Sequence, residues 1–170
     1  MARLIGENHN FCIALGELLY LSFFWGSGKD EKMKIKAFKQ LPEESRMIRT
    51  RVFMEEQKFE NEFDEIDSIS THIVIFESAE PVATCRLYFS GERQCYVIGR
   101  IAVLKDFRGR NLGAELLKAA EKEIISLNGN TAELLAQVRV SAFYEKKGYR
   151  SLGEVLSDEG CPHVWMRKEL

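Results

Sequence analysis

The stretch "GRIAVLKDFRGRNLGAELL" (residues 99–117) joins a mostly apolar run to a loop of arginine, glycine and asparagine, and then to a segment with apolar residues at helical spacing. A strand, a loop and a helix in this order place several free backbone N–H groups at a helix N-terminus, where the helix dipole favours negative charge. The stretch therefore predicts a site for an anion such as a phosphate. The alternative is a basic turn whose glycines serve geometry alone.

Five residues of this loop support the anion site. Gly109 and Gly113 lack the Cβ that would keep a phosphate away from the backbone, and Asn111 is among the few residues that tolerate a left-handed turn. Arg108 and Arg110 add charged donors. The loop has neither the Gly-Lys-Ser/Thr ending of a P-loop nor the glycine spacing of a dinucleotide fold.

The composition predicts one globular domain. The chain has 170 residues, of which 45% are hydrophobic and 29% charged, enough for one ordinary core. Its net charge of −2 provides no overall basic field, so nucleic acid and an anionic membrane are not expected as partners. The four cysteines are scattered, with no CxxC pair and no histidine at ligand spacing, which predicts free thiols, a cytoplasmic protein and no metal site.

Residues 1–32 read as an extension and residues 33–170 as the domain. The segment from Phe11 to Trp25 is apolar with one charged residue, Glu17, and is shorter than the roughly 20 residues that span a bilayer. Three explanations stay open: a leader or an artefactual start before Met33, a helix that docks on the domain or on a second subunit, and membrane targeting.

Periodicity and turn residues predict a mixed α+β fold, with a sheet that carries helices on both faces. The predicted strands span residues 33–40, 71–78, 80–91, 94–104, 132–138 and 163–170, and the predicted helices residues 42–57, 112–127 and 140–147. Gly91 lies at the turn of a predicted hairpin. The buried face of the helix 112–127 is predicted to consist of Leu112, Leu116, Leu117, Ala120 and Ile124.

Two motifs carry a resemblance to a known family. "RGRNLG" (residues 108–113) resembles the Arg/Gln-x-x-Gly-x-Gly/Ala pyrophosphate loop of the GNAT superfamily of acetyl-CoA-dependent N-acetyltransferases, with Asn111 in place of the first glycine. "AQVRVSAFYEKKGY" (residues 136–149) resembles the later strand and helix of that family. "RTRVFMEEQ", "EIDSISTH" and "GEVLSDEGCPHVWMRKEL" are similar to its ElaA/YjcF-like branch, so the resemblance covers Met33 to Leu170.

The resemblance implies a GNAT fold, whose central, mostly antiparallel sheet of six to seven strands splays between the strand ending in "IAV" and the strand "ELLAQ". It implies acetyl-CoA as co-substrate and direct transfer, in a ternary complex, to a primary amine of a small molecule or a lysine. Gly99 independently predicts a bulge or a close ligand approach, or else a plain hairpin glycine. The implied cofactor-binding residues are Ile101, Ala102, Val103, Arg108, Gly109, Arg110, Asn111, Leu112, Gly113, Ala114, Gln137 and Tyr144.

The family pattern assigns to Tyr144 the proton that the departing thiolate needs, although the tyrosine could also merely pack behind Phe143. An amine acceptor must lose its own proton, and Glu56 and His163 are the two candidate catalytic bases. A solvated position for Glu56 and a structural hydrogen bond for His163 stay open as alternatives.

The acids Glu60, Glu62, Asp64, Glu65 and Asp67 gather within one short run. If they face the cleft they would attract a cationic acceptor, and otherwise they form a solvated loop. With Arg86 they also resemble acyl-homoserine-lactone synthases, although the tryptophan usual in the first helical region of those enzymes is absent. A further alternative is a non-catalytic module that binds acetyl-CoA or a partner, and a homodimer is compatible with each of these functions.

Overall fold

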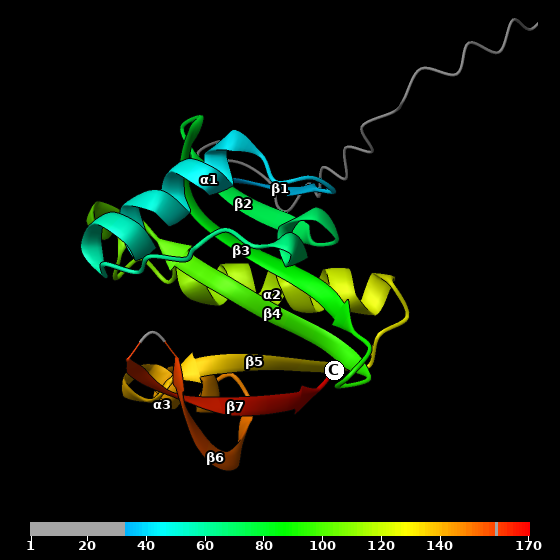
Figure 1. Cartoon of the computed structure of the whole chain (residues 1–170). Coiled ribbons are helices and arrows are strands. Elements are labelled where there is room, and N and C mark those ends of the chain that lie inside the picture. Colours follow the sequence, from blue (N-terminus) through cyan, green and yellow to red (C-terminus); the bar gives the residue numbers. More distant parts are fainter. Residues whose placement is uncertain (1–32, 159) are drawn as a thin grey trace, which may run out of the picture.

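The computed structural model describes residues 33–158 and 160–170, so the expectations for the apolar segment 11–25 lie outside the described residues. One seven-stranded sheet has the order β1-β2-β3-β4-β5-β7-β6 (Figure 1). Its strands are β1 (Met33–Phe38), β2 (Thr71–Glu77), β3 (Glu80–Ser90), β4 (Cys95–Val103), β5 (Thr131–Gln137), β6 (Arg150–Asp158) and β7 (Cys161–Glu169).

The two halves of the sheet meet at a short parallel contact. All other neighbouring strands are antiparallel, whereas β4 and β5 pair only through Tyr96 with Ala132 and Val97 with Glu133. Beyond Val97, β4 has no strand partner on that side, and the two strands diverge (Figure 1). The predicted splay of the sheet is confirmed.

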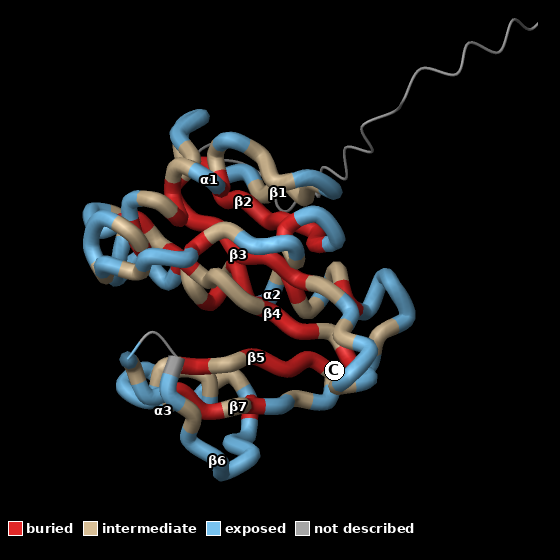
Figure 2. Tube along the Cα trace, viewed as in Figure 1, coloured by how far each residue is buried: buried red, intermediate tan, exposed pale blue. Residues whose placement is uncertain are grey.

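Helices cover both faces of the sheet, as expected. Alternate side chains of β2 point to opposite faces, because the period of a strand is two. Val74 and Phe76 pack against the first helix in one buried cluster, while Ile73 and Ile75 pack in a second cluster with α2 (Leu112–Ser126). Figure 2 shows the buried positions concentrated along the central strands.

The helix α2 matches its prediction within one residue at its C-terminal end. All five residues of its predicted core face are buried: Leu112, Leu116, Leu117, Ala120 and Ile124. Among the described residues, no helix is long and apolar enough to cross a membrane.

The prediction of one α-helix over residues 42–57 was wrong in part, because only its first half is α-helical. This segment consists of α1 (Glu43–Arg49) followed by a π-helix (Thr50–Glu56), in which the amide of Gln57 bonds to the carbonyl of Val52 at 3.2 Å. π-turns are rare and concentrate at functional sites. Periodicity missed the wide turns, because Val52 and Phe53 face the sheet in either geometry.

The strand β6 was missing from the prediction. The helix α3 (Ser141–Glu145) is shorter than the predicted 140–147: a 3₁₀ turn over Val138–Val140 includes the first predicted residue, and the helix ends two residues early. The sequence of β6 does not alternate between apolar and polar residues, because β6 lies at an edge of the sheet where Leu152 and Val155 are exposed. Gly153, with a φ of 93°, also interrupts the regular strand geometry.

A β-bulge interrupts β4 directly after Gly99. Gly99 lies opposite Arg86 and Ala102 lies opposite Thr84, so two residues of β4 face one residue of β3. Within the bulge, Arg100 has a φ of 52°, an unusual value for a residue with a side chain. The predicted bulge is confirmed, one residue beyond the glycine that signalled it.

Candidate active site

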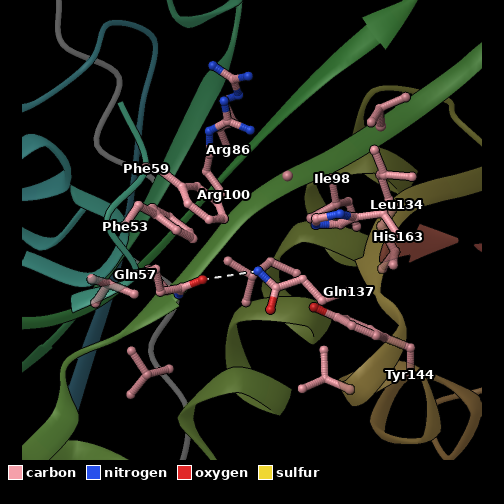
Figure 3. A pocket seen from close by; sticks show the side chains of 18 of the residues that line it. Phe53, Gln57, Phe59, Arg86, Ile98, Arg100, Leu134, Gln137, Tyr144 and His163 are labelled. Atoms are coloured by element: carbon pink, nitrogen blue, oxygen red, sulfur yellow. Dashed lines mark hydrogen bonds between the residues drawn. The ribbon is translucent and has the colours of Figure 1, made fainter. Parts of the chain in front are cut away.

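A cavity of about 880 Å³ lies where β4 and β5 diverge. Figure 3 shows Phe53, Phe59, Arg86 and Arg100 on one wall, and Leu134, Gln137, Tyr144 and His163 on the other. The first wall comes from the π-helix, the loop after it, β3 and β4, and the second from β5, β7 and α3. The splay of the sheet thus creates the cavity.

The structure brings most of the predicted site residues to this cavity. Its lining includes Ile101, Ala102, Val103, Arg108, Gln137 and Tyr144, together with both candidate bases, Glu56 and His163. The remaining predicted residues do not line it, but lie on the adjoining loop and the first turn of α2: Gly109, Arg110, Asn111, Leu112, Gly113 and Ala114.

The loop before α2 has backbone amides that are not used in backbone hydrogen bonds within the part of the chain that the structure describes. Gly109 and Asn111 have φ values of 79° and 63°, both in the left-handed region, and α2 begins at Leu112. No backbone carbonyl of the described residues accepts a hydrogen bond from the amides of residues 109–113. Leu112 and Ala114 contribute buried side chains to the core, so only their backbone is available to a ligand.

Both loop arginines are already engaged. Arg108 donates through Nε to the carbonyl of Val103 at 3.0 Å and through its terminal nitrogens to Glu56 at 2.7 and 2.7 Å. This pairing raises the pKa of Arg108 and lowers the pKa of Glu56. Arg110 donates to Glu77 at 3.1 Å. An anion on the loop would therefore share these arginines with carboxylates.

Tyr144 is half-buried at the cavity, and Figure 3 shows its hydroxyl pointing toward Gln137. Burial raises the pKa of Tyr144 to about 12, so the phenol keeps its proton at neutral pH. Its ring packs edge-on against Phe143 and Tyr149, with centroids 5.0 and 6.2 Å apart. Packing thus fixes the ring while the hydroxyl stays on the cavity side.

His163 is buried, and its Nδ1 lies 2.8 Å from the carbonyl oxygen of Cys161. Because a carbonyl only accepts, we assign the imidazole proton to Nδ1. In the neutral ring Nε2 then carries the lone pair. The described residues offer no hydrogen-bond partner to Nε2, which is free to take a proton from a ligand.

A hydrogen bond spans the cavity. The amide nitrogen of Gln137, at the end of β5, donates to the side-chain oxygen of Gln57 at 3.0 Å (Figure 3, dashed line). The oxygen of Gln137 accepts from Arg139 at 2.8 Å. Gln57 follows the π-helix directly, so this bond ties the first wall to the second.

The acidic run divides between its two expected roles and a third. Asp64 lines the cavity and Glu60 and Glu65 are exposed, whereas two other acids pair inside the protein. Glu62 and Asp67 are buried and hydrogen-bonded to Arg49 at 2.6 Å each, while Asp64 accepts from Arg86 at 2.5 Å. Burial raises the pKa of Glu62, whereas hydrogen bonds from the arginines outweigh burial and lower the pKa of Asp67. These three acids therefore neutralise Arg49 and Arg86. The sequence analysis did not predict such pairs, because it considered the acids without partners.

The sequence analysis missed several lining residues. Gln57, Tyr88, Arg100 and Trp165 line the cavity together with the aromatic rings of Phe53 and Phe59. Only Arg100 had a signal, namely its place beside the glycine that predicts a bulge. Among the described residues there is no group of three or more His, Cys, Asp or Glu side chains that could hold a metal.

Comparisons with known proteins agree with this arrangement. Residues 40–170 match the family model described as acetyltransferase (GNAT) domain. The uncharacterized N-acetyltransferase YjcF of Bacillus subtilis is 35% identical over 125 residues, which cover 72% of this chain and 88% of that protein. The crystal structure of Escherichia coli ElaA superposes with a TM-score of 0.71 at 26% identity, over 81% of this chain and 99% of that one.

The fold is also shared with more distant proteins. A Bacillus subtilis acetyltransferase in complex with CoA has a TM-score of 0.64 at 17% identity, over 82% of this chain and 99% of that one, which shows the fold alone. The resemblance to the ElaA/YjcF-like branch is confirmed by YjcF and ElaA. The chain belongs to the GNAT family of acetyltransferases and is an acyltransferase.

Proposed function

We propose that the protein moves the acetyl group of acetyl-CoA to a primary amine by direct transfer in a ternary complex. One observation carries the proposal: the unpaired edge of β4 and Tyr144 lie at one splayed cavity, and the adjoining loop holds the amides of residues 109–113 without a described backbone partner. The CoA complex of a protein with the same fold supports this use of the cleft.

The residues present fit this co-substrate. The amides of the loop, at the N-terminus of α2, suit a pyrophosphate, and Gly109 has no neighbouring atom within 4 Å of an added Cβ. Backbone groups of Ile101 and Val103 on the open edge of β4 suit the amides of a pantetheine arm. A backbone N–H near Val103 would receive the charge that develops on the thioester oxygen.

Proton transfer would run through two side chains. A lysine-like ammonium must lose its proton, which at pH 7 costs roughly 4 to 5 kcal/mol. His163 is the better placed of the two candidate bases, because its Nε2 carries a lone pair, whereas the ion pair with Arg108 lowers the pKa of Glu56. The amine nitrogen then bonds to the carbonyl carbon, the carbon–sulfur bond breaks, and Tyr144 protonates the departing sulfur. The surplus proton on the attacking nitrogen then returns to the Tyr144 oxygen, which leaves a neutral amide and a neutral phenol.

Two buried cysteines favour direct attack over an acyl-cysteine intermediate. Cys85 is buried, and burial raises the pKa of its thiol to about 12. Burial also raises the pKa of Cys95. Since the thiolate is the nucleophile, neither residue is activated for covalent catalysis.

Calorimetric titration with acetyl-CoA tests the proposal first, followed by thiol release with a panel of amines. We expect micromolar binding that the double change Arg108→Ala/Arg110→Ala weakens by about tenfold or more. Arg51→Ala, an exposed site that does not line the cavity, is the control and should bind as the native chain does. Absence of binding to the native chain would overturn the cofactor assignment, and parallel lines in two-substrate kinetics would overturn direct transfer.

A further inference from the structure

We propose that the acceptor amine also carries a carboxylate, and that Arg100 binds this carboxylate at the wall across from Tyr144 and His163. The inference rests on the proposed function and narrows its substrate to amino acids and related amino-carboxylates. Figure 3 shows Arg100 beside Arg86 on that wall. Three independent observations carry it: the bulge, the unused donors and the charge of the lining.

The bulge directs Arg100 into the cavity. In a regular strand, successive side chains alternate between the two faces, but the extra residue in β4 breaks this alternation and re-aims the side chain. Arg100 adopts a φ of 52° there, in the left-handed region that is unfavourable for a residue with a side chain. Such backbone conformations concentrate at ligand sites, where the surrounding structure holds them.

Arg100 keeps hydrogen-bonding capacity for a ligand. Its Nε lies 3.0 Å from a carboxylate oxygen of Glu62 and 3.4 Å from the Glu62 carbonyl, and its Nη2 lies 3.5 Å from Asp64. Neither terminal nitrogen donates a hydrogen bond to any described residue. The side chain of Arg100 is 29% exposed, so these donors are open to the cavity.

Further groups surround the same place. Arg86 also lines the cavity and adds positive charge there, although its Nε is buried out of reach of a ligand. Tyr88 also lines the cavity, and burial raises the pKa of its hydroxyl, which keeps the proton on the oxygen. Asp64, by contrast, already accepts two hydrogen bonds from Arg86. This wall therefore offers a ligand mainly donors, which suit a carboxylate and not a second ammonium.

The charges of the lining agree. The cavity is lined by four arginines, Arg86, Arg100, Arg108 and Arg139, but by only two carboxylates, Glu56 and Asp64. Glu56 is paired with Arg108 and Asp64 with Arg86. Glu62, the partner of Arg100, is fully buried outside the lining and is shared with Arg49. The cavity field thus favours an anionic group near Arg100.

Acetyl transfer to three amines of matched length tests the inference: γ-aminobutyrate, butylamine and putrescine, which end in a carboxylate, a methyl group and a second ammonium. Glycine, β-alanine and lysine extend the carboxylate series. We expect the best amino-carboxylate to exceed butylamine and putrescine by about tenfold or more in kcat/KM. In Arg100→Gln this preference should fall by about tenfold, through KM, while kcat/KM for butylamine stays within about twofold.

Two further variants keep the inference testable if Arg100→Gln does not fold. Arg100→Lys keeps the charge and should retain part of the preference. Tyr88→Phe leaves the ion pairs intact and should weaken the preference severalfold. Arg46→Gln, an exposed site that does not line the cavity, is the matched control and should leave the preference unchanged.

A binding measurement separates this inference from the proposed function. The native chain saturated with CoA is titrated with the amino-carboxylates, and we expect binding that Arg100→Gln weakens by about tenfold. Binding without any transfer would contradict the proposed function and support the carboxylate site. Transfer that favours putrescine, an equal loss for all three amines in Arg100→Gln, or no binding of any amino-carboxylate would overturn the inference.

Discussion

The guanidinium of Arg108 and the carboxylate of Glu56 form two parallel hydrogen bonds of 2.7 and 2.7 Å. The pair joins the loop before α2 to the C-terminal end of the π-helix, 52 residues apart in the chain. Two residues proposed for separate tasks are therefore coupled, and a change in one alters the other.

Changing Glu56 to Gln should release Arg108 for the phosphates of acetyl-CoA. Both side chains are about two-fifths exposed, and such pairs are worth little in solution, so we expect acetyl-CoA to bind up to about fivefold more tightly. Calorimetry measures this change. If Glu56 were the catalytic base, kcat would instead fall by about two orders of magnitude, and that result would displace His163 from the role proposed here.

Changing Tyr144 to Phe removes the proton proposed for the thiolate. We expect kcat to fall by about 10² to 10⁴ while acetyl-CoA binding stays within about threefold, measured by thiol release and calorimetry. Tyr149→Phe is the matched control, because Tyr149 is buried and lies outside the cavity lining. Equal kcat values for the two variants would remove Tyr144 from the mechanism.

Changing Arg49 to Leu should strongly destabilise the fold. Arg49 is 1% exposed, and its loss leaves the buried carboxylates of Glu62 and Asp67 without their main partner. We expect the free energy of unfolding in urea to fall by about 3 to 5 kcal/mol. The control Arg46→Leu, on the same helix but 47% exposed, should change it by less than about 1 kcal/mol. A similar small loss in both variants would show that the buried network contributes little.

The stability should fall as the pH drops below the ordinary pKa of histidine. Burial lowers the pKa of His72 from 6.5, and its Nδ1 has no partner among the described residues. The unfolded chain therefore takes up a proton that the folded chain refuses, and the free energy of unfolding falls by at most about 1.4 kcal/mol per pH unit from this group. Urea unfolding between pH 7 and 5 should show a shallower slope in His72→Gln, and an identical slope would contradict this origin.

Much of the fold could be predicted because its signals are local. The spacing of Leu116, Leu117 and Ala120 predicted the buried face of α2, and Gly99 predicted the bulge. The cavity-lining position of Tyr144 followed from the family resemblance, and that of His163 from its place at the start of the last predicted strand. Their catalytic roles stay predictions.

The features that could not be predicted from the sequence depend on residues that are distant in the chain. Asp67 is neutralised by Arg49 from α1 and Arg86 from β3, a meeting that no local pattern encodes. The π-helix was missed because the apolar spacing of Val52 and Phe53 suits an α-helix equally well. Arg100 points into the cavity only because a bulge two residues long re-aims it.

The order of the strands also determines when the protein can assemble. β7 lies between β5 and β6 in the sheet, yet follows both of them in the chain. β5 pairs with β4 at only two positions but with β7 along its whole length, from Thr131 to Gln137. During synthesis, the wall that holds Tyr144 and His163 therefore cannot form until β7 has left the ribosome, and the cavity stays incomplete until then.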